Sequence, residues 1–335
     1  MSAVSGAAVI GLRMGARHAE AYLALGVKVI AVCDLDGGRL ADARGRYGAE
    51  VATTDYRDAL ARDDVSVVSV ASPDGFHVEH CVAAMQAGKD VLCEKPLALS
   101  VAECREIVRA ADETGRVCMV GQVCRYAPGF VKAKGLVDAG ALGEFFFVES
   151  EYAHNYEKAR GVGDWRLDPK RHPVIGGGCH AVDLLRWVAG EIEEVFAYAN
   201  HKALPEWPCD DCTVAVARFA SGVVGKVFVG IGVRRPYTMR SVFYGREGTL
   251  ICDNTSPEVL LARASRADAL EWEHIPVDIS SHNVQAEASE FLAAVRGEKP
   301  LVTDAREGAR TVAACAAIVR SAKLGKPCSP ERLPS

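Results

Sequence analysis

Short apolar runs alternate with helical stretches over the first third of the chain, and this alternation constrains the fold more than any other feature. The runs cover residues 7–10, 27–32, 65–71, 91–93 and 117–120. Between them, apolar residues recur at three- and four-residue spacing in 16–25, 38–47, 77–87 and 101–114. Strands that are apolar on both faces and joined by helices form parallel sheets. The sequence therefore predicts an α/β, Rossmann-type doubly wound parallel sheet.

The pattern changes after Gly121. A helix is expected over 128–139, and strand patterns follow over 145–152 and from 195 to about 261. Consecutive strands without helices between them indicate an antiparallel sheet. Two helices, 284–295 and 305–324, close the chain. We therefore expect residues 1–122 to form the Rossmann-type domain and residues 123–335 to form an α+β domain with a large, mostly antiparallel sheet.

Composition excludes several classes of protein. The 335 residues carry 39 basic and 44 acidic side chains, a net charge of −5, so no basic field favours nucleic acid or anionic lipid. No apolar run approaches the roughly 20 residues of a membrane span, and the N-terminus lacks the charged region of a secretory signal. The 12 cysteines are scattered; the close pair Cys209 and Cys212 has zinc-like spacing but no second pair of ligands. We expect reduced thiols, no metal and a cytoplasmic location.

A glycine turn joins the first expected strand to the first helix. It reads Gly11-Leu12-Arg13-Met14-Gly15, so its glycines are four apart and the full G-x-G-x-x-G pattern is missing. Two glycines can mark a simple turn. In the first strand-to-helix turn of such a sheet, however, they allow a pyrophosphate to approach the backbone and the N–H groups of a helix start. This position favours phosphate binding by residues 11–14.

Asp34 follows the second expected strand. A carboxylate there accepts hydrogen bonds from ribose hydroxyls and repels a ribose 2′-phosphate. No arginine comes immediately after Asp34 to receive such a phosphate, although Arg39 lies further on. The cofactor expected is therefore NAD, with NADP less favoured. Asp34 can also cap the next helix.

Glu94-Lys95-Pro96 closes the fourth apolar run, where open α/β sheets bind their ligands. Proline disfavours helical geometry at Lys95, so the backbone there is expected to be extended. Ser72 and Pro73 follow the third run and are expected at the same rim. His77 either begins a helix or contacts the cofactor, and the sequence favours neither.

A second group of polar residues lies far downstream. Three glycines, 176–178, precede His180 and Asp183, which lie three residues apart and so share a helical face. Imidazole titrates near neutrality, so His180 is a candidate general base with Asp183 as its partner or as a substrate contact. Alternatively, both residues serve only to begin the helix.

These motifs together resemble the Gfo/Idh/MocA (glucose–fructose oxidoreductase / inositol dehydrogenase) family over nearly the whole chain. The matching stretches are Gly11–Gly15 with His18, Cys33-Asp34, Ser72–His77, Ala87–Lys89, Cys93–Pro96, Gly121-Gln122, Arg125-Tyr126, Trp165-Arg166, Gly177–Asp183 and Tyr244-Gly245.

The resemblance implies that the first domain binds NAD(P) and that the sheet of the second mediates homodimers or homotetramers. It implies a small-molecule substrate, a sugar or cyclitol, and Lys95 bound to its reacting oxygen, with Glu94 orienting backbone or cofactor. The cofactor contacts expected are Gly11, Leu12, Arg13, Met14, Asp34, Ser72, Pro73, His77, Glu94, Lys95, Gln122, Trp165 and Arg166. The substrate contacts expected are Lys95, Arg125, Tyr152, Asn155, Trp165, His180 and Asp183. Trp165-Arg166 can equally be a buried structural pair.

Two departures from the family pattern matter. The phosphate turn is one residue short, and Gly176 stands where the family often has an aspartate, four residues before the histidine. Asp183 is then the remaining carboxylate beside His180 in the sequence.

Three functions fit these motifs. The first is an NAD-dependent oxidoreductase that moves a hydride between nicotinamide and a secondary hydroxyl or ketone of a sugar or polyol. The second retains NAD and uses transient oxidation for elimination or glycoside cleavage. The third is a non-catalytic regulator that binds dinucleotide or sugar. The presence of both Lys95 and His180 favours an enzyme and the first function.

Overall fold

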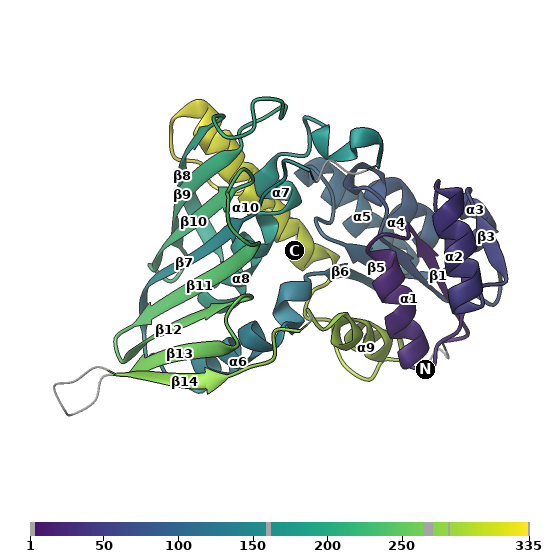
Figure 1. The fold of residues 1–335 in the computed structure, drawn as a ribbon, viewed down its shortest axis with the longest axis horizontal. Helices are drawn as coiled ribbons and strands as arrows, with labels where there is room; N and C mark the ends of the chain where they lie inside the picture. The colour runs from purple at the N-terminus through teal and green to yellow at the C-terminus, as the bar shows by residue number, and fades with distance from the viewer. Residues whose placement is uncertain (1–3, 159–161, 264–270, 281, 334–335) are drawn as a thin grey trace. The chain divides into compact units, whose positions relative to one another are not determined.

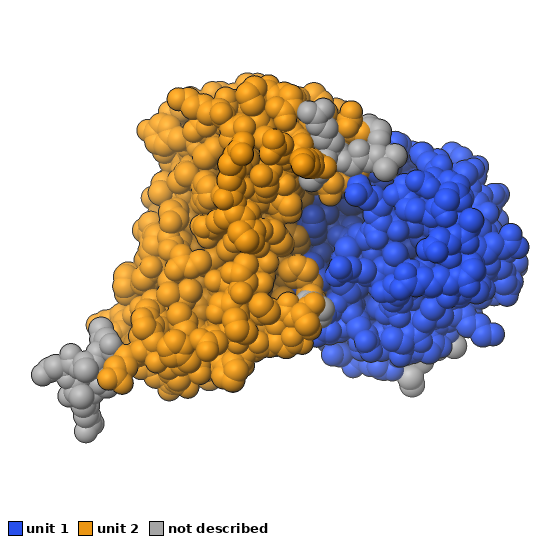
Figure 2. Space-filling model, in the orientation of Figure 1, with its two compact units in different colours: residues 1–123, 283–312, 335 blue, residues 124–282, 313–334 orange. Residues whose placement is uncertain are grey.

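The computed structural model describes residues 4–158, 162–263, 271–280 and 282–333. The chain forms two compact units, coloured separately in Figure 2. Unit 1 contains residues 1–123 and 283–312, and unit 2 contains residues 124–282 and 313–334.

Unit 1 is built on a six-stranded parallel sheet in the order β3-β2-β1-β4-β5-β6. Every residue of β1, β2, β4, β5 and β6 is buried, as expected for a sheet covered on both faces. The strands are β1 (Ala7–Ile10), β2 (Val29–Cys33), β3 (Val51–Thr53), β4 (Val67–Val70), β5 (Asp90–Glu94) and β6 (Cys118–Gly121). The helices are α1 (Gly15–Ala24), α2 (Gly37–Tyr47), α3 (Tyr56–Leu60), α4 (His77–Gln86), α5 (Val101–Thr114) and α9 (Val284–Val295), with a 3-10 turn η1 (Asp74–Phe76).

This strand order places the candidate residues of unit 1 at one edge. The order reverses between β1 and β4, which is where doubly wound sheets bind dinucleotides. The carboxyl ends of parallel strands meet at the same edge, so the segments after β1, β2, β4, β5 and β6 gather there. Strands β1, β5 and β6 of this sheet are labelled in Figure 1. These segments begin with Gly11, Asp34, Ala71, Lys95 and Gln122.

A polar cap fixes the start of helix α5 near this edge. Ser100 Oγ accepts the N–H of Glu103 at 3.2 Å, and Glu103 Oε2 accepts the N–H of Leu99 at 3.1 Å. This reciprocal pair begins α5, whose bounds the sequence predicted, directly after the Glu94–Pro96 turn. The helix ends at Gly115, which has φ +63°, a left-handed conformation that favours glycine.

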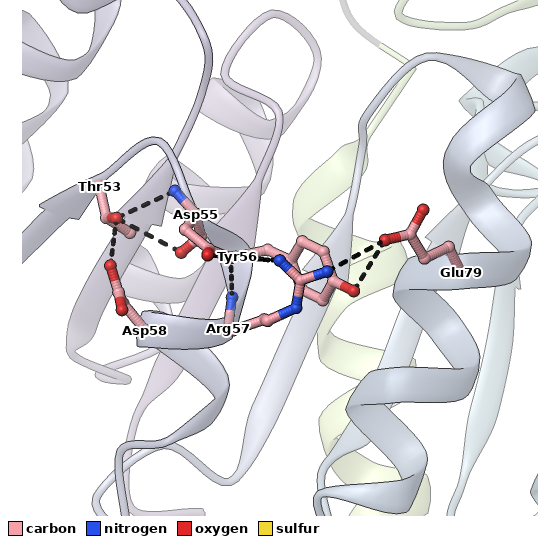
Figure 3. A network of polar contacts seen from close by, with 6 residues as sticks. All are labelled: Thr53, Asp55, Tyr56, Arg57, Asp58 and Glu79. Carbon is pink, nitrogen blue, oxygen red and sulfur yellow. Dashed lines mark hydrogen bonds and ion pairs between the residues drawn. The ribbon is translucent and has the colours of Figure 1, made fainter.

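A polar network joins the short helix α3 to α4 (Figure 3). Thr53 Oγ1 donates to Asp58 at 2.6 Å, Asp55 caps α3 by accepting the N–H of Arg57, and Tyr56 donates to Glu79 of α4 at 2.9 Å. The sequence patterns predicted neither β3 nor α3. Each has at most five residues, and β3 is half-buried throughout, so neither shows a clear alternating or helical pattern.

Unit 2 is built on an eight-stranded sheet in the order β14-β13-β12-β11-β7-β10-β9-β8. All neighbouring pairs are antiparallel except β7 and β10, which are parallel. The strands are β7 (Phe145–Ala153), β8 (Ile192–Asn200), β9 (Cys212–Phe219), β10 (Val224–Gly230), β11 (Thr238–Gly245), β12 (Gly248–Asp253), β13 (Glu258–Arg263) and β14 (Trp272–Pro276). The helices are α6 (Pro128–Asp138), α7 (Pro173–Gly176) and α8 (Cys179–Ala189), with 3-10 turns η2 (Val123–Tyr126) and η3 (Val162–Leu167).

One face of this sheet is covered by α8, which packs on β7, β10 and β11, and by α6, which packs on β12 and β13. The predicted fold class is confirmed in both parts: a parallel doubly wound sheet, followed by a large and mostly antiparallel one. Among the described residues, no helix combines the length and apolar character that crossing a bilayer requires.

The chain returns to unit 1 after the large sheet. From the sequence, residues 123–335 were expected to form one domain, whereas residues 283–312 belong to unit 1. The physical reason is that α9 packs against α1 and β5 of the first sheet. Helix α10 (Ala305–Leu324) contributes residues 305–312 to unit 1 and residues 313–324 to unit 2.

Candidate active site

The glycine turn after β1 needs glycine at both ends. Gly11 has φ +88°, and a Cβ there would lie 2.4 Å from the carbonyl oxygen of Ala71. A Cβ at Gly15 would lie 2.6 Å from Cγ1 of Val9, so this glycine lets α1 approach β1 closely. The turn is one residue shorter than the common pattern, yet both physical requirements for glycine are met.

Helix α1 begins at this turn without a side-chain cap. Its N-cap residue is Met14, whose side chain makes no capping hydrogen bond with the first N–H groups of the helix. Such a helix start is suited to bind an anion. Arg13 is exposed and Met14 is half-buried, whereas Leu12 is buried and its N–H is used within the protein.

Asp34 holds the turns around it. Its Oδ2 accepts the N–H of Leu12 at 2.7 Å, and its Oδ1 accepts the N–H of Asp36 at 2.9 Å. Arg39 Nη2 lies 3.3 Å from Oδ1 of Asp34. Helix α2 is capped by Asp36, which accepts the N–H of Arg39, rather than by Asp34.

His77, the first residue of α4, is fully buried. Its Nδ1 lies 2.8 Å from the carbonyl oxygen of Pro96, and its Nε2 lies 3.0 Å from the carbonyl oxygen of Ser72. The ring thus connects the segment after β4 with the segment after β5. The sequence left open whether His77 begins a helix or contacts the cofactor; it does begin α4, and both its ring nitrogens contact backbone carbonyls.

Glu94 fixes the backbone of Lys95. Its Oε2 accepts the N–H of Lys95 at 3.2 Å, and its Oε1 lies 3.1 Å from Nε2 of His18. The chain of contacts continues from His18 Nδ1 to Ser69 Oγ at 3.0 Å and from Ser69 Oγ to the hydroxyl of Tyr22 at 2.8 Å. The peptide bond between Lys95 and Pro96 is cis.

This environment favours the ionised form of Glu94. Burial by itself would raise its pKa, but the hydrogen bond from His18 and the charges of His18, Lys95 and His77 outweigh burial and lower the pKa. Glu94 is therefore a carboxylate that orients the Lys95 backbone.

A second buried carboxyl group, Glu287 of α9, lies near Glu94. Its side chain is fully buried, and neither of its oxygens has a hydrogen-bond partner among the residues that the structure describes. Burial, the charge of Glu94 and the charge of Glu290 raise the pKa of Glu287 well above its usual value. The surroundings therefore favour the protonated form of Glu287 and the ionised form of Glu94, a separation typical of paired carboxyl groups in different surroundings.

In unit 2, three glycines bring other groups close to the start of α8. A Cβ at Gly177 would lie 2.6 Å from the ring of Tyr152, and a Cβ at Gly178 would lie 2.5 Å from Cγ2 of Val229. His180, buried at 6% exposure, follows in the first turn of α8. Its ring stacks on Tyr152 of β7 with centroids 6.5 Å apart.

The guanidinium of Arg171 occupies the space beside Gly176. A Cβ at Gly176 would lie 2.5 Å from Cζ of Arg171, and Nη2 of Arg171 donates to the carbonyl oxygen of Gly176 at 3.1 Å. The same guanidinium lies 4.7 Å from the ring centre of Trp165. Where the family pattern often has an aspartate, this chain therefore has a glycine and a buried arginine.

Asp183 is bound by another arginine, Arg125 of η2. Its Oδ2 and Oδ1 accept from Nε and Nη2 of Arg125, both at 2.7 Å. The two side chains are 4% and 1% exposed. This is the bidentate geometry of a strong charge-assisted pair. Two residues that the sequence predicted as substrate contacts are thus brought together, and Asp183 has a structural partner besides any role beside His180.

Aromatic side chains surround Tyr152 on the covered face of the sheet. Its hydroxyl lies 2.6 Å from that of Tyr156, and its ring packs on His154 and Tyr237. Burial raises the pKa of Tyr152 and lowers that of His154, so both side chains are neutral near neutral pH. Neutral rings and hydroxyls of this kind suit a polar, uncharged ligand.

The remaining expected contacts have varied surroundings. Arg166 stacks on Trp165 and lies over Tyr156, so Trp165-Arg166 adjoins the aromatic group. Asn155 uses its side-chain oxygen to accept the N–H of Glu157 at 2.9 Å. Gln122 follows β6 and is 2% exposed.

Comparison with known proteins identifies the family. Residues 6–122 match the oxidoreductase family with an NAD-binding Rossmann fold, and residues 130–251 match the C-terminal domain of Gfo/Idh/MocA proteins. The inositol 2-dehydrogenase 2 of Saccharopolyspora erythraea is 30% identical over 244 residues, which are 71% of this chain and 69% of that protein. The chain belongs to the Gfo/Idh/MocA oxidoreductase family.

Other known proteins match this chain over longer stretches. The inositol 2-dehydrogenase of Rubrobacter xylanophilus is 28% identical over 327 residues, covering 96% of this chain and 91% of the relative. A levoglucosan dehydrogenase, solved in complex with NADH and L-sorbose, superimposes with a TM-score of 0.89 at 24% identity and covers 98% of this chain and 99% of that one. At this identity the structural likeness shows the fold alone. The family resemblance inferred from the motifs is confirmed.

Several residues of the candidate site were not predicted from the sequence. His18 matched the family pattern but was given no role, and Tyr22, Ser69, Glu287 and Arg171 were not considered. Two of them leave a signal in the sequence: Ser69 interrupts the apolar run of β4, and Glu287 falls among the buried positions of α9. A polar residue at a position that the pattern assigns to the core indicates a buried hydrogen-bond network or a functional site.

Proposed function

We propose that the protein is an NAD-dependent dehydrogenase that transfers a hydride between nicotinamide and a secondary hydroxyl or ketone of a sugar or cyclitol. The observation that carries this proposal is the buried hydrogen bonding around Glu94, which holds the backbone of Lys95 at the carboxyl end of β5. The relatives named inositol 2-dehydrogenase and levoglucosan dehydrogenase support this class of substrate.

The residues at the sheet edge fit NAD. The positive φ of Gly11, the uncapped start of α1 and the carboxylate of Asp34 provide the features that a dinucleotide requires at a switch point. Asp34 disfavours the 2′-phosphate of NADP, and Arg39, the nearby cation, is paired with Asp34 and Asp36. We therefore expect NAD to be the better substrate when both cofactors are compared at equal concentration.

In this proposal Lys95 and His180 have different roles in the reaction. When bound, NAD supplies the acceptor for the hydride of the substrate carbon. The Lys95 ammonium donates to the substrate oxygen and stabilises its developing negative charge. His180 accepts the hydroxyl proton, and the Arg125–Asp183 pair keeps the start of α8 in place.

The substitution His180→Ala tests this role. Removing a general base typically costs about 10²- to 10⁴-fold in rate. We expect kcat to fall by that order while NADH binding, followed by nicotinamide fluorescence, stays near the wild-type affinity. Unchanged turnover would remove His180 from the mechanism, and loss of NADH binding would show that the residue acts through the fold instead.

We also propose that the protein forms homo-oligomers through the face of the large sheet that lies opposite α6 and α8. In β9, Val214 and Val216 are exposed while their neighbours Thr213 and Ala215 are buried, so the two faces of the sheet are distinct. Tyr198 of β8 pairs with Val214, and it is 73% exposed. Val224 of β10 adds to the same apolar surface. Such a surface is typical of a subunit interface.

A further inference from the structure

His77 has a hydrogen-bond pattern that decides its protonation state. Both of its ring nitrogens face backbone carbonyl oxygens, Pro96 O at 2.8 Å and Ser72 O at 3.0 Å, and the side chain has no exposed surface. A carbonyl oxygen accepts hydrogen bonds and cannot donate one. A neutral imidazole carries a single N–H, so it would satisfy one carbonyl and turn a lone pair toward the other. Only the ring with protons on both nitrogens satisfies both contacts.

The surroundings are suited to a positive charge at this position. Glu94 is ionised, and the charge of His77 is one of the factors that lower its pKa. Two other ionisable residues lie on the adjoining segments, Asp74 in the preceding 3-10 turn and Lys95 directly after β5. His80 lies one turn further along α4 and interacts electrostatically with His77. Burial lowers the pKa of His80 to about 4, so this neighbour is neutral above pH 5.

The two histidines of α4 hold the same segment in different ways. His80 Nδ1 lies 2.9 Å from the hydroxyl of Ser72, which can donate to a neutral ring. His77 instead contacts the backbone carbonyl of Ser72 through Nε2 and the backbone carbonyl of Pro96, the residue after Lys95, through Nδ1. Of these two histidines, His77 is therefore the one that links the segments following β4 and β5.

We infer that His77 is a positioning residue for Lys95: a doubly protonated ring that fixes the Lys95–Pro96 turn against the Ser72–Pro73 turn. Glu94 holds the N–H of Lys95, and His77 holds the carbonyl of Pro96, so the backbone is anchored on both sides of the lysine. The inference rests on the proposed function in assigning Lys95 to the reaction. A shift of about 1 Å in a reacting group can cost about a hundredfold in rate, which is the reason to anchor it.

The protonation state is tested by NMR on the full chain. Histidine labelled with ¹⁵N in the rings, in a deuterated background, reports each ring nitrogen separately, and His77→Gln assigns the His77 signals. We expect both nitrogens of His77 to carry protons at pH 7.5, with His80 showing one protonated nitrogen in the same spectrum. A single protonated nitrogen on His77 would overturn the inference.

The positioning role is tested by comparing His77→Leu and His77→Gln with the matched variant His80→Gln on the same helix. Reductive ¹³C-methylation of lysines, with Lys95→Arg to assign the signal, follows the environment of Lys95 without turnover. We expect both His77 variants to shift the Lys95 signal and to lower kcat about ten- to a hundredfold, with the leucine variant more affected and KM changed less. His80→Gln is expected to leave the Lys95 signal in place.

The outcomes separate this inference from the proposed function. If the wild-type protein oxidises no polyol, the proposed function fails, while the two NMR measurements still decide the state of His77 and its effect on Lys95. If turnover is present but the His77 variants leave both the Lys95 signal and kcat unchanged, the inference fails alone. Should His77→Leu not fold, His77→Gln and the wild-type spectrum decide the result.

Discussion

Arg125 and Asp183 form an ion pair from which water is almost excluded. The effect of this pair on the stability of the protein depends on that burial. Taking two charges out of water is costly, and the pair is stable because both carboxylate oxygens accept from the guanidinium. Removing one partner leaves the other charge buried without it. Removing one residue of a buried pair therefore lowers the free energy of unfolding much more than removing one residue of an exposed pair.

We predict that Arg125→Met lowers the free energy of unfolding by about 3–5 kcal/mol, the usual cost of breaking a buried pair. Denaturation with urea, followed by circular dichroism, measures this loss. Arg218→Met serves as the control, because the Arg218–Glu194 pair is largely exposed and should contribute less than about 1 kcal/mol. Equal losses of unfolding free energy in the two variants would contradict the claim that burial determines how much the Arg125–Asp183 pair contributes to stability.

Several site residues could be predicted from the sequence because the backbone at their position accepts only one type of residue. Gly11 and Gly15 were recognised from a strand-to-helix turn, and the steric reason for each is present. The partner of Asp183 could not be predicted, because Arg125 lies 58 residues earlier and only the folded chain brings the two together. Arg171 was missed for a related reason: its place beside Gly176 depends on the turn between η3 and α7.

At the scale of secondary structure, helix α9 shows how a long amphipathic pattern can be predicted while its packing cannot. The bounds of α5, α9 and α10 match the expected ranges, because each has apolar residues at helical spacing over at least 12 residues. Nothing in that periodicity shows that α9 packs against α1 and β5. The consequence is that Glu287 lies beside Glu94, two residues 193 positions apart in the sequence.

Glu287→Gln tests the neutral state of this carboxyl group. Because the pKa of Glu287 is raised in the folded protein, the folded state binds one more proton than the unfolded state once the pH exceeds the ordinary value near 4.3. Wild-type stability should therefore fall as pH rises through the interval between the ordinary and the raised pKa. Glutamine does not titrate. The free energy of unfolding of the variant, relative to that of the wild type, should therefore increase by up to about 1.4 kcal/mol per pH unit in that interval.

The measurement is urea denaturation of both proteins at pH values from 4 to 9. Their stabilities should be similar at the acidic end and diverge steadily toward neutral pH, with the variant more stable. Two curves that stay parallel over the whole range would contradict a neutral Glu287.

At the scale of the whole molecule, the two units differ in what their surfaces offer. The strands of unit 1, other than the edge strand β3, are buried on both faces, whereas the large sheet of unit 2 presents exposed apolar residues on the face opposite α8. Burying that surface would remove Tyr198, Val214, Val216 and Val224 from water. Assembly through this face is the proposal that the surface supports.

We predict that Val216→Lys shifts the protein toward a monomer of about 35.8 kDa. A lysine in the middle of an apolar interface must be desolvated for the subunits to associate, which is unfavourable. Light scattering after size-exclusion chromatography measures the mass. Val302→Lys, at an exposed position of unit 1, is the control and should leave the mass unchanged. A wild-type protein that is already monomeric, or a variant with unaltered mass, would contradict the proposed interface.

The most direct test of the account measures NADH formation from NAD with a panel of inositols, monosaccharides and sugar acids, for the wild-type protein and Lys95→Met. The account predicts that at least one polyol is oxidised by the wild type, and that Lys95→Met loses about 10²-fold or more in kcat while NADH binding persists. Turnover by Lys95→Met at the wild-type rate would contradict it, as would the absence of oxidation of any polyol and of reduction of the matching ketones.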